Sequence, residues 1–274
     1  MKKEKKKQVK NLQVMSVDLE TDLGADLEIV FNDILPRILD EFDSRGIKAT
    51  FFVVSDLLKN YSKEIKEIAR RGHEVASHSR THSFLNFDNS WEEINSSRLD
   101  FLDVGIDVSG FRAPGYVTVS DHKHLAMVKR AGYSYDASFA AYLPGRYFRP
   151  LIGRRPYVAH GDELKKSESK KLIEMPMPTL IWPSGLNGLS YFKLFYPVSF
   201  WIARLFGMRY MFYLHLWEFI DVSRLKPNGI FEKLIACGCG DKAWKIFMKY
   251  LDLAEKQSVK FVSCKEYLNS KGLS

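Results

Sequence analysis

Two histidines, His78 and His82, stand four residues apart in the stretch HEVASHSRTHSF, and they are the first residues of the chain to suggest chemistry. Imidazole nitrogens bind Zn²⁺ and related divalent ions. The pair alone is weak evidence, because two histidines at this spacing also occur as solvated side chains. A metal site needs at least one further ligand from another part of the chain.

Two acids in the stretch SVDLE, Asp18 and Glu20, are candidates for that ligand. Their spacing of two places them on the same side of a strand. Carboxylates so placed repel each other and need a cation or a proton between them. One carboxylate with the two imidazoles makes a three-ligand set with open positions, which is typical of a catalytic divalent ion. The other carboxylate is then free to act as a base toward water.

Further polar residues end later predicted strands. Arg112 can hold a carboxylate in its ionised form through two hydrogen bonds, and Asp136 lies in the next strand. His215 ends a late strand and is a candidate general acid, and Trp217 and Glu218 follow it. We expect Glu218 to cap or to form a nearby salt bridge rather than to bind the ion. In parallel α/β folds the carboxyl ends of the strands share one edge, so these side chains should meet there.

The elements that must position these residues alternate between strand and helix patterns. Strands are predicted at 12–20, 48–56, 73–79, 133–139, 171–177, 210–217 and 259–268, and a short strand with a turn is predicted at 108–115. Amphipathic helices are predicted at 26–46, 57–72, 90–105 and 120–132, and each of these ranges ends at a glycine, as helices commonly do. This order predicts a parallel sheet or barrel wrapped by helices. We expect a single domain over residues 11–274.

The net charge of +8 is concentrated in residues 1–10, where six lysines and one glutamate contribute +5. This basic tail is either a disordered, solubilising arm or a segment attracted to an anionic surface. No apolar segment follows the lysines, so we expect no signal peptide. No interleaving of basic and aromatic residues resembles an RNA-binding motif, so we expect no nucleic-acid partner.

An aromatic stretch at residues 185–217 could be mistaken for a membrane span. Its longest uncharged run is ten residues and contains a proline, whereas a spanning helix needs about 20 apolar residues. Its aromatic side chains are either core or an exposed face that meets lipid: Tyr191, Phe192, Phe195, Tyr196, Phe200, Trp201 and Phe206. We therefore expect no transmembrane helix and a cytoplasmic protein, free or peripheral at the inner membrane surface.

Five motifs in this order resemble the polysaccharide deacetylase family, carbohydrate esterase family 4. They are SVDLE (16–20), SHSRTH (77–82), FRAPGY (111–116), YDASF (135–139) and YLHLWE (213–218), with IEMPM (173–177) in support. The Asp-x-Glu first motif is similar to one subgroup of the family. The resemblance implies a distorted, incomplete (β/α)7-type barrel in a single α/β domain.

The resemblance also implies a role for each matching residue. It assigns the metal, Zn²⁺ or another divalent ion such as Co²⁺, Ni²⁺ or Mn²⁺, to Glu20, His78 and His82. It assigns proton transfer to Asp18 as base and His215 as acid, supported by Arg112 and Asp136, the latter tuning the histidine or pairing with the arginine. It places the oxyanion and substrate contacts at Gly115, Tyr116 and Trp217. Glu20 is one methylene longer than the usual aspartate, and this leaves the choice of metal open.

The implied reaction is hydrolysis of an N-acetyl or related acyl group on an amino sugar or polysaccharide. The partner is then an N-acetylated glycan, either free or lipid-linked, with peripheral membrane contact in the second case. Two alternatives stay open at this point. One is a hydrolase of non-sugar cyclic amides with the same fold, and the other is a catalytically inactive, carbohydrate-binding relative.

Overall fold

The computed structural model describes residues 11–86, 88–115, 121–139, 155–159, 171–177, 187–208 and 210–273. The basic tail at residues 1–10 and Tyr116 lie outside these ranges.

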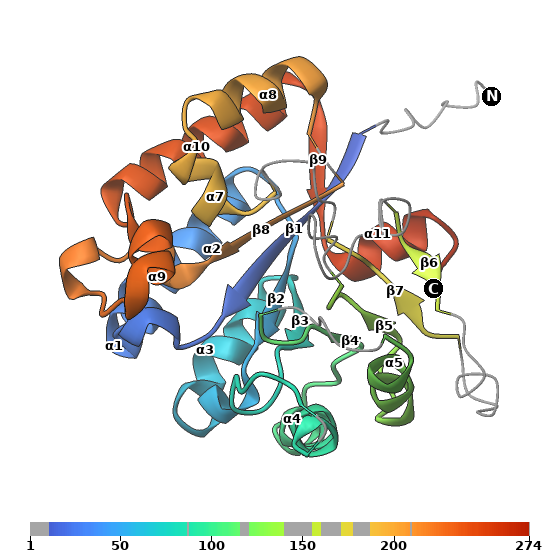
Figure 1. The fold of residues 1–274 in the computed structure, drawn as a ribbon. Coiled ribbons are helices and arrows are strands. Elements are labelled where there is room, and N and C mark those ends of the chain that lie inside the picture. Colours follow the sequence, from blue (N-terminus) through green and yellow to red (C-terminus); the bar gives the residue numbers. More distant parts are fainter. Residues whose placement is uncertain are drawn as a thin grey trace, which may run out of the picture.

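One sheet of nine strands organises the described residues, in the spatial order β6-β7-β5-β4-β3-β2-β1-β8, with β9 paired to the first part of β1 (Figure 1). The strands are β1 (Asn11–Leu19), β2 (Ala49–Val53), β3 (Glu74–Ser77), β4 (Gly110–Phe111), β5 (Tyr135–Asp136), β6 (Tyr157–Val158), β7 (Ile173–Glu174), β8 (Met211–His215) and β9 (Val259–Val262). Within these ranges β6–β7 is an antiparallel pair and the other pairs are parallel. The predicted α/β class, with a curled and mostly parallel sheet, is confirmed.

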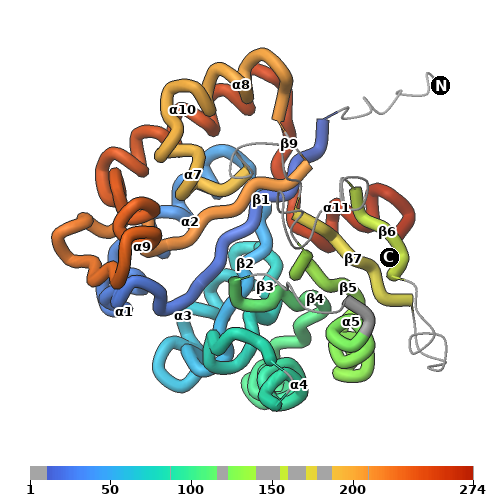
Figure 2. The backbone as a smooth tube through the Cα atoms, in the orientation of Figure 1, coloured from blue at the N-terminus to red at the C-terminus, as the bar shows by residue number. Residues whose placement is uncertain are grey.

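Helices surround this sheet on its outside (Figure 2). They are α1 (Leu27–Ile29), α2 (Leu35–Ser44), α3 (Leu58–Arg70), α4 (Ser90–Asp103), α5 (Asp121–Arg130), α7 (Leu189–Leu194), α8 (Val198–Phe206), α9 (Gly229–Ala236), α10 (Asp241–Lys256) and α11 (Cys264–Ser270). None of the helices in the described ranges has the length and apolar character needed to cross a membrane.

The first predicted helix is present but is not uniform. A π-helical turn at Val30–Ile34 separates α1 from α2, and Pro36 follows in the first turn of α2. Proline has no backbone N–H, so it is tolerated in a first turn. Helix α2 buries Ile38, Leu39 and Phe42, as the 3.6-residue pattern predicts.

The last predicted strand is shorter than expected. Strand β9 ends at Val262, and the following residues form α11 instead of continuing the strand to residue 268. The cause is a capping box: Ser263 Oγ accepts from the N–H of Glu266, whose carboxylate accepts from the N–H of Ser263.

Strand β1 is the central element for function, because it pairs with β2, β8 and β9 and is buried along most of its length. In its register with β8, the Cα of Asp18 lies opposite that of His215. Strand β3 lies next to β2 and ends one residue before His78. The carboxyl ends of β1, β3 and β8 therefore bring segments that are distant in sequence to one edge of the sheet.

Candidate active site

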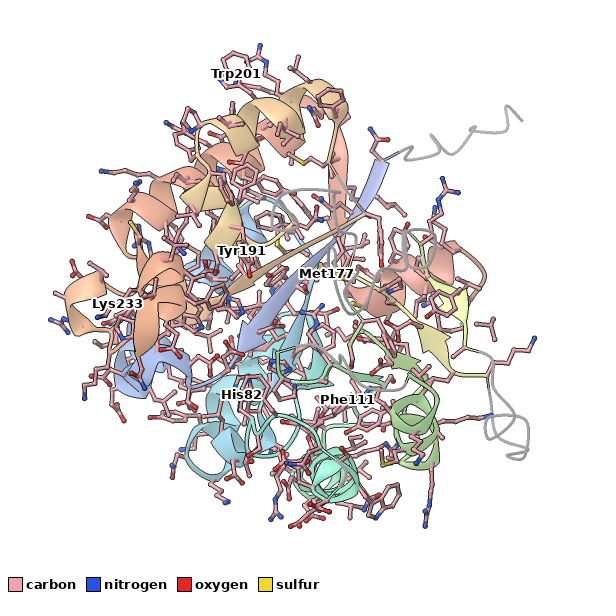
Figure 3. All side chains as sticks on the ribbon, viewed as in Figure 1. His82, Phe111, Met177, Tyr191, Trp201 and Lys233 are labelled. Atoms are coloured by element: carbon pink, nitrogen blue, oxygen red, sulfur yellow. The ribbon has the colours of Figure 1, made fainter. Side chains whose placement is uncertain are left out.

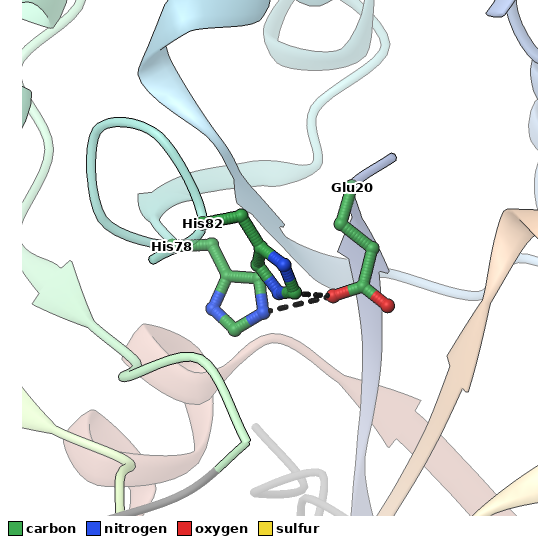
Figure 4. Close-up of side chains that lie close together, drawn as sticks. All are labelled: Glu20, His78 and His82. Atoms are coloured by element: carbon green, nitrogen blue, oxygen red, sulfur yellow. Dashed lines mark hydrogen bonds and ion pairs between the residues drawn. The ribbon is translucent and has the colours of Figure 1, made fainter. Parts of the chain in front are cut away.

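The three predicted metal ligands converge at this edge. Glu20 follows β1, while His78 and His82 follow β3 (Figure 4). Glu20 Oε2 lies 3.1 Å from His78 Nε2 and 2.8 Å from His82 Nε2. One ligand atom from each of the three residues falls within 4.8 Å of the other two. Glu20, His78 and His82 thus form a candidate site for a divalent metal.

The loop between the two histidines is held in an unusual backbone conformation. Ser79 and His82 have φ of +68° and +65°, in the left-handed region that residues other than glycine rarely adopt. Glu93 of α4 accepts hydrogen bonds at Oε2 from the N–H groups of Arg80 and Thr81, both 2.9 Å long. These bonds from a helix hold the loop so that both imidazoles face Glu20.

The second ring nitrogen of each imidazole, Nδ1, contacts a neighbouring oxygen atom. His78 Nδ1 lies 2.9 Å from the carbonyl oxygen of Arg112, so Nδ1 carries the proton and donates it. His82 Nδ1 lies 3.0 Å from Asp22 Oδ1. Such partners fix the orientation of the ring and leave Nε2 to bind a metal. Both Nε2 atoms point toward Glu20 in consequence.

One buried atom argues directly for a cation. His82 Nε2 is buried and makes no well-formed hydrogen bond in the described structure, although it lies near Glu20. Burial lowers the pKa of His82, but the charge of Glu20 and the bond to Asp22 outweigh it and raise that pKa to about 10. Burial likewise opposes ionisation of Glu20, yet the charges of His215 and His82 hold its pKa well below the usual value. In the metal-free protein, a proton on His82 therefore occupies the position that suits a metal cation. The two imidazole nitrogens and the carboxylate oxygen of this site are donors that fit a divalent ion.

The second oxygen of Glu20 is held by Trp217. The indole Nε1–H donates to Glu20 Oε1 at 3.0 Å, and the indole stacks on the ring of His215 with centroids 4.9 Å apart. Trp217 is only 2% exposed. In this position Trp217 orients both the carboxylate of Glu20 and the imidazole of His215. The substrate contact expected of Trp217 stays a prediction.

Asp18 lies beside this site in a buried ion pair. Arg112, which is fully buried, donates from Nη1 to Asp18 Oδ1 at 2.6 Å. Both Nη atoms of Arg112 also lie 3.2 Å from Ser16 Oγ. The second oxygen, Asp18 Oδ2, lies 4.0 Å from His215 Nε2. The arginine thus fixes one oxygen of Asp18 and leaves the other toward the site, where it can accept a proton.

His215 is held by Glu218, which lies in the 3-10 turn that follows β8 (Leu216–Phe219). Glu218 Oε2 accepts from the backbone N–H of His215 at 2.9 Å and lies 3.4 Å from its Nδ1. Glu218 Oε1 accepts from Lys193 Nζ at 2.9 Å and from Ser190 Oγ at 2.8 Å. The expectation that Glu218 caps and forms a salt bridge is confirmed.

These contacts set the charge of His215. Burial lowers its pKa, but the carboxylates of Glu20, Glu218 and Asp18 outweigh burial and raise the pKa to about 9. Burial raises the pKa of Glu218, but Lys193 and His215 outweigh it and lower that pKa to about 2. His215 is therefore protonated at neutral pH in the metal-free protein, as a general acid must be.

Asp136 is not brought to His215. Its Cα pairs with that of Phe111, so its side chain points to the opposite face from Arg112, the residue that directly follows β4. There Asp136 Oδ1 lies 3.2 Å from His124 Nε2 and accepts from Ser138 Oγ at 2.7 Å. The carboxylate at His215 Nδ1 is that of Glu218. A tuning role for Asp136 stays a prediction.

Gly115 lies in the turn after β4, with φ of +62°. This positive φ favours glycine, and a Cβ here would lie 2.2 Å from the exposed ring of Phe84, which would have to move. Its role as an oxyanion donor stays a prediction. Tyr116, the next predicted contact, lies outside the described residues.

Two supporting residues escaped the sequence reasoning. Asp22 continues the spacing of two that joins Asp18 to Glu20, and this signal could have revealed it. It lies in a 3-10 turn (Asp22–Gly24), which carries its carboxylate to His82. Lys193 is a lone charge in the aromatic segment SYFKLFY, and a lone charge inside an apolar run often has a buried partner.

A comparison of the chain with known families agrees with this geometry. The family model of polysaccharide deacetylase matches residues 15–135. This match covers less than half of the chain, so the similarity to the polysaccharide deacetylase family is shown for that part. The matched part runs from β1 to β5 and includes the three candidate ligands with Asp18 and Arg112, whereas His215 lies beyond it.

Two curated relatives also match parts of this chain. Peptidoglycan-N-acetylglucosamine deacetylase of Bacillus cereus is 35% identical over 69 residues, which are 25% of this chain and 23% of the relative. Chitin deacetylase 1 of Bombyx mori is 33% identical over 129 residues, or 42% of this chain and 23% of the relative. The chain therefore matches about a quarter of the length of each relative.

The fold extends the similarity to almost the whole chain. The crystal structure of Puue allantoinase covers 96% of this chain and 91% of its own, with a TM-score of 0.61 and 15% sequence identity. At this identity the likeness concerns the fold alone.

Proposed function

We propose that this chain belongs to the polysaccharide deacetylase family and is a metal-dependent hydrolase that removes N-acetyl or related acyl groups from an amino sugar in a glycan. The observation that carries the proposal is the convergence of Glu20, His78 and His82 beside two proton-transfer candidates. Asp18 Oδ2 and Glu20 Oε1 lie 4.0 and 3.6 Å from His215 Nε2. A base, an acid and a metal site thus share one small volume.

Each residue has a separate task in this reaction. When bound, a divalent cation supplies Lewis acidity, which polarises an amide carbonyl and makes water easier to deprotonate. Asp18, oriented by Arg112, accepts a proton from the attacking water at Oδ2. His215 donates a proton from Nε2 to the departing nitrogen. Water adds to the acyl carbon and the C–N bond breaks, giving a carboxylic acid and a sugar amine.

Zn²⁺ is our proposal for the metal. Two imidazole nitrogens and one carboxylate oxygen, with positions left open, are a donor set that catalytic zinc uses. Co²⁺, Ni²⁺ and Mn²⁺ accept the same donors. Glu20 is one methylene longer than the usual aspartate, and this leaves the choice among these ions open. Metal analysis of the purified protein, followed by reconstitution of the chelated protein with each ion, distinguishes them.

The finer proposal for the substrate is a glycan linked to a lipid and presented at a membrane surface. Its support is the exposed apolar face of α8, where Trp201, Leu205 and Phe206 are 53%, 71% and 77% exposed. The related enzymes named above are deacetylases of peptidoglycan and of chitin. Short N-acetylglucosamine oligomers, free and attached to a lipid, are therefore the substrates to compare.

An acetate-release screen tests the proposed reaction. The metal-loaded protein should release acetate from N-acetylated glycans and should not open the ring of cyclic imides. Glu20→Ala is the matched control and should release none. Ring opening without acetate release would favour a cyclic amide hydrolase. Glycan binding without either reaction, in protein with full metal occupancy, would favour an inactive relative.

A further inference from the structure

Helix α8 is apolar on two faces, and one of them is without a partner among the described residues. Ser199, Phe200 and Ala203 face the core. Val198, Trp201, Leu205 and Phe206 are between 53% and 77% exposed, and their spacing of three to four places most of them along one side of the helix. Trp201 lies at the outer edge of the molecule, away from the sheet (Figure 3). A surface helix of a soluble domain normally carries polar residues on this side.

A cavity lined by cations lies beside this helix. It has a volume of about 340 Å³, lies between α8 and α10, and is lined by Phe200, Arg204, Lys249, Lys256 and other residues. Its one acid, Asp252, is paired with Arg45 at 2.8 Å. Arg204 also lies over the ring of Trp201, 5.3 Å from its centroid. The exposed apolar side chains of α8 therefore lie next to a basic cavity.

The basic tail joins the fold next to the same helix. Asn11, the first described residue, donates from Nδ2 to the carbonyl oxygen of Gln257 at 3.4 Å. Gln257 donates from Nε2 to the carbonyl oxygens of Ala203 and Arg204 in α8, at 3.3 and 3.2 Å. In the sequence, the six lysines of residues 1–10 directly precede Asn11.

We propose that α8 and the cavity beside it dock the protein on an anionic lipid bilayer. Aromatic and aliphatic side chains flanked by Lys and Arg are the composition of helices that lie in a membrane interface. The cavity, lined by Arg204, Lys249 and Lys256, suits the phosphate of a lipid headgroup. A second copy of the chain would place these cations against each other, so charge complementarity favours the bilayer.

This docking leaves the catalytic edge of the sheet open. Asn11 begins β1, and the C-terminal end of α8 lies beside it, whereas Glu20 and His215 lie at the opposite ends of β1 and β8. The docking goes beyond the proposed reaction and does not depend on it, because vesicle binding is measured without substrate. A protein that does not bind vesicles could still be a deacetylase, and a protein without deacetylase activity could still bind vesicles.

Cosedimentation of the full-length protein with vesicles tests the docking. Vesicles of one part phosphatidylglycerol to two parts phosphatidylcholine should bind the protein, and pure phosphatidylcholine should bind it at least tenfold more weakly. Trp201→Ser/Leu205→Ser/Phe206→Ser should weaken binding to the anionic vesicles at least tenfold. Arg204→Gln/Lys249→Gln/Lys256→Gln should do the same and should flatten the dependence on salt.

Matched controls separate the surface from general charge and hydrophobicity. Lys59→Gln/Lys63→Gln/Lys66→Gln on α3 removes equal charge, and Leu99→Ser/Leu102→Ser on α4 removes exposed apolar side chains elsewhere. Both should bind vesicles like the wild type. Equal loss in these controls, or no binding by the wild type, overturns the proposal. So does a dimer in sedimentation velocity that the α8 serine variant dissociates, because a second copy would then cover α8.

Discussion

Lys193 Nζ lies 2.9 Å from Glu218 Oε1, and both side chains are fully buried next to His215. Glu218 in turn contacts His215 through its other oxygen. The lysine thus supplies the positive charge that keeps Glu218 ionised, and Glu218 supplies the negative charge that favours protonated His215. A buried charge without its partner is costly, so the pair must be kept or removed as a whole.

Lys193→Met should destabilise the protein by about 3–5 kcal/mol, because it leaves the Glu218 carboxylate buried and unpaired. Chemical denaturation measures this loss. The double variant Lys193→Met/Glu218→Gln should recover part of it, since a neutral amide replaces the unpaired charge. If the double variant is as unstable as the single one, packing of the lysine stem rather than its charge sets the stability.

Glu218→Gln should shift the pH dependence of turnover. Glu218 raises the pKa of His215, so its removal lowers that pKa, and the acid loses its proton at lower pH. The basic limb of the kcat/KM profile should therefore move to lower pH while the metal content stays unchanged. An unmoved basic limb would mean that His215 is not the group that titrates there.

Asp22→Asn should weaken metal affinity by about 10- to 100-fold, the usual effect of losing a carboxylate that orients a ligand histidine. Turnover at saturating metal should remain near that of the wild type, because Asp22 reaches the site only through His82. Metal titration with a competing chelator measures the affinity. Asp33→Asn, which removes an exposed acid of the same type, is the control and should bind metal normally.

Asp18→Asn should retain the metal and lose turnover by about 10²- to 10⁴-fold, the range for a positioned base. Asparagine keeps the shape and a hydrogen bond to Arg112 but cannot take up a proton. Elemental analysis and acetate release are measured on the same preparation. Activity near the wild-type level would assign the base to another residue, and loss of metal would make Asp18 a ligand.

Metal affinity should rise with pH up to about pH 10. The pKa of His82 is raised to about 10 without metal, so below that pH a proton must leave Nε2 before a cation can bind. Each unit of lower pH should then weaken apparent affinity about tenfold for one displaced proton. Calorimetry in buffers of different ionisation enthalpy counts this proton. Affinity that is flat between pH 6 and 9 would exclude His82 as a ligand.

The sequence by itself indicated the candidate chemistry of this protein. The acid pair Asp18 and Glu20 and the histidine pair His78 and His82 stand out in local patterns at the ends of predicted strands, and the resemblance to the deacetylase family assigned the ligand role to Glu20. The alternation of strand and helix patterns, which is also local, predicted the parallel sheet. The Ser263 capping box was also legible in the sequence, yet the apolar residues around it favoured a strand.

The tertiary structure decided what depends on the direction of side chains and on contacts distant in sequence. Asp136 ends β5 and Arg112 directly follows the neighbouring β4, but the pairing register sends Asp136 to the face of α5. Lys193 meets Glu218 only because α7 packs against the end of β8. The apolar sequence of α8 likewise does not show that its side chains are exposed, because burial depends on which other elements cover the helix. Local spacing carries none of this information, because packing joins residues that the chain keeps far apart.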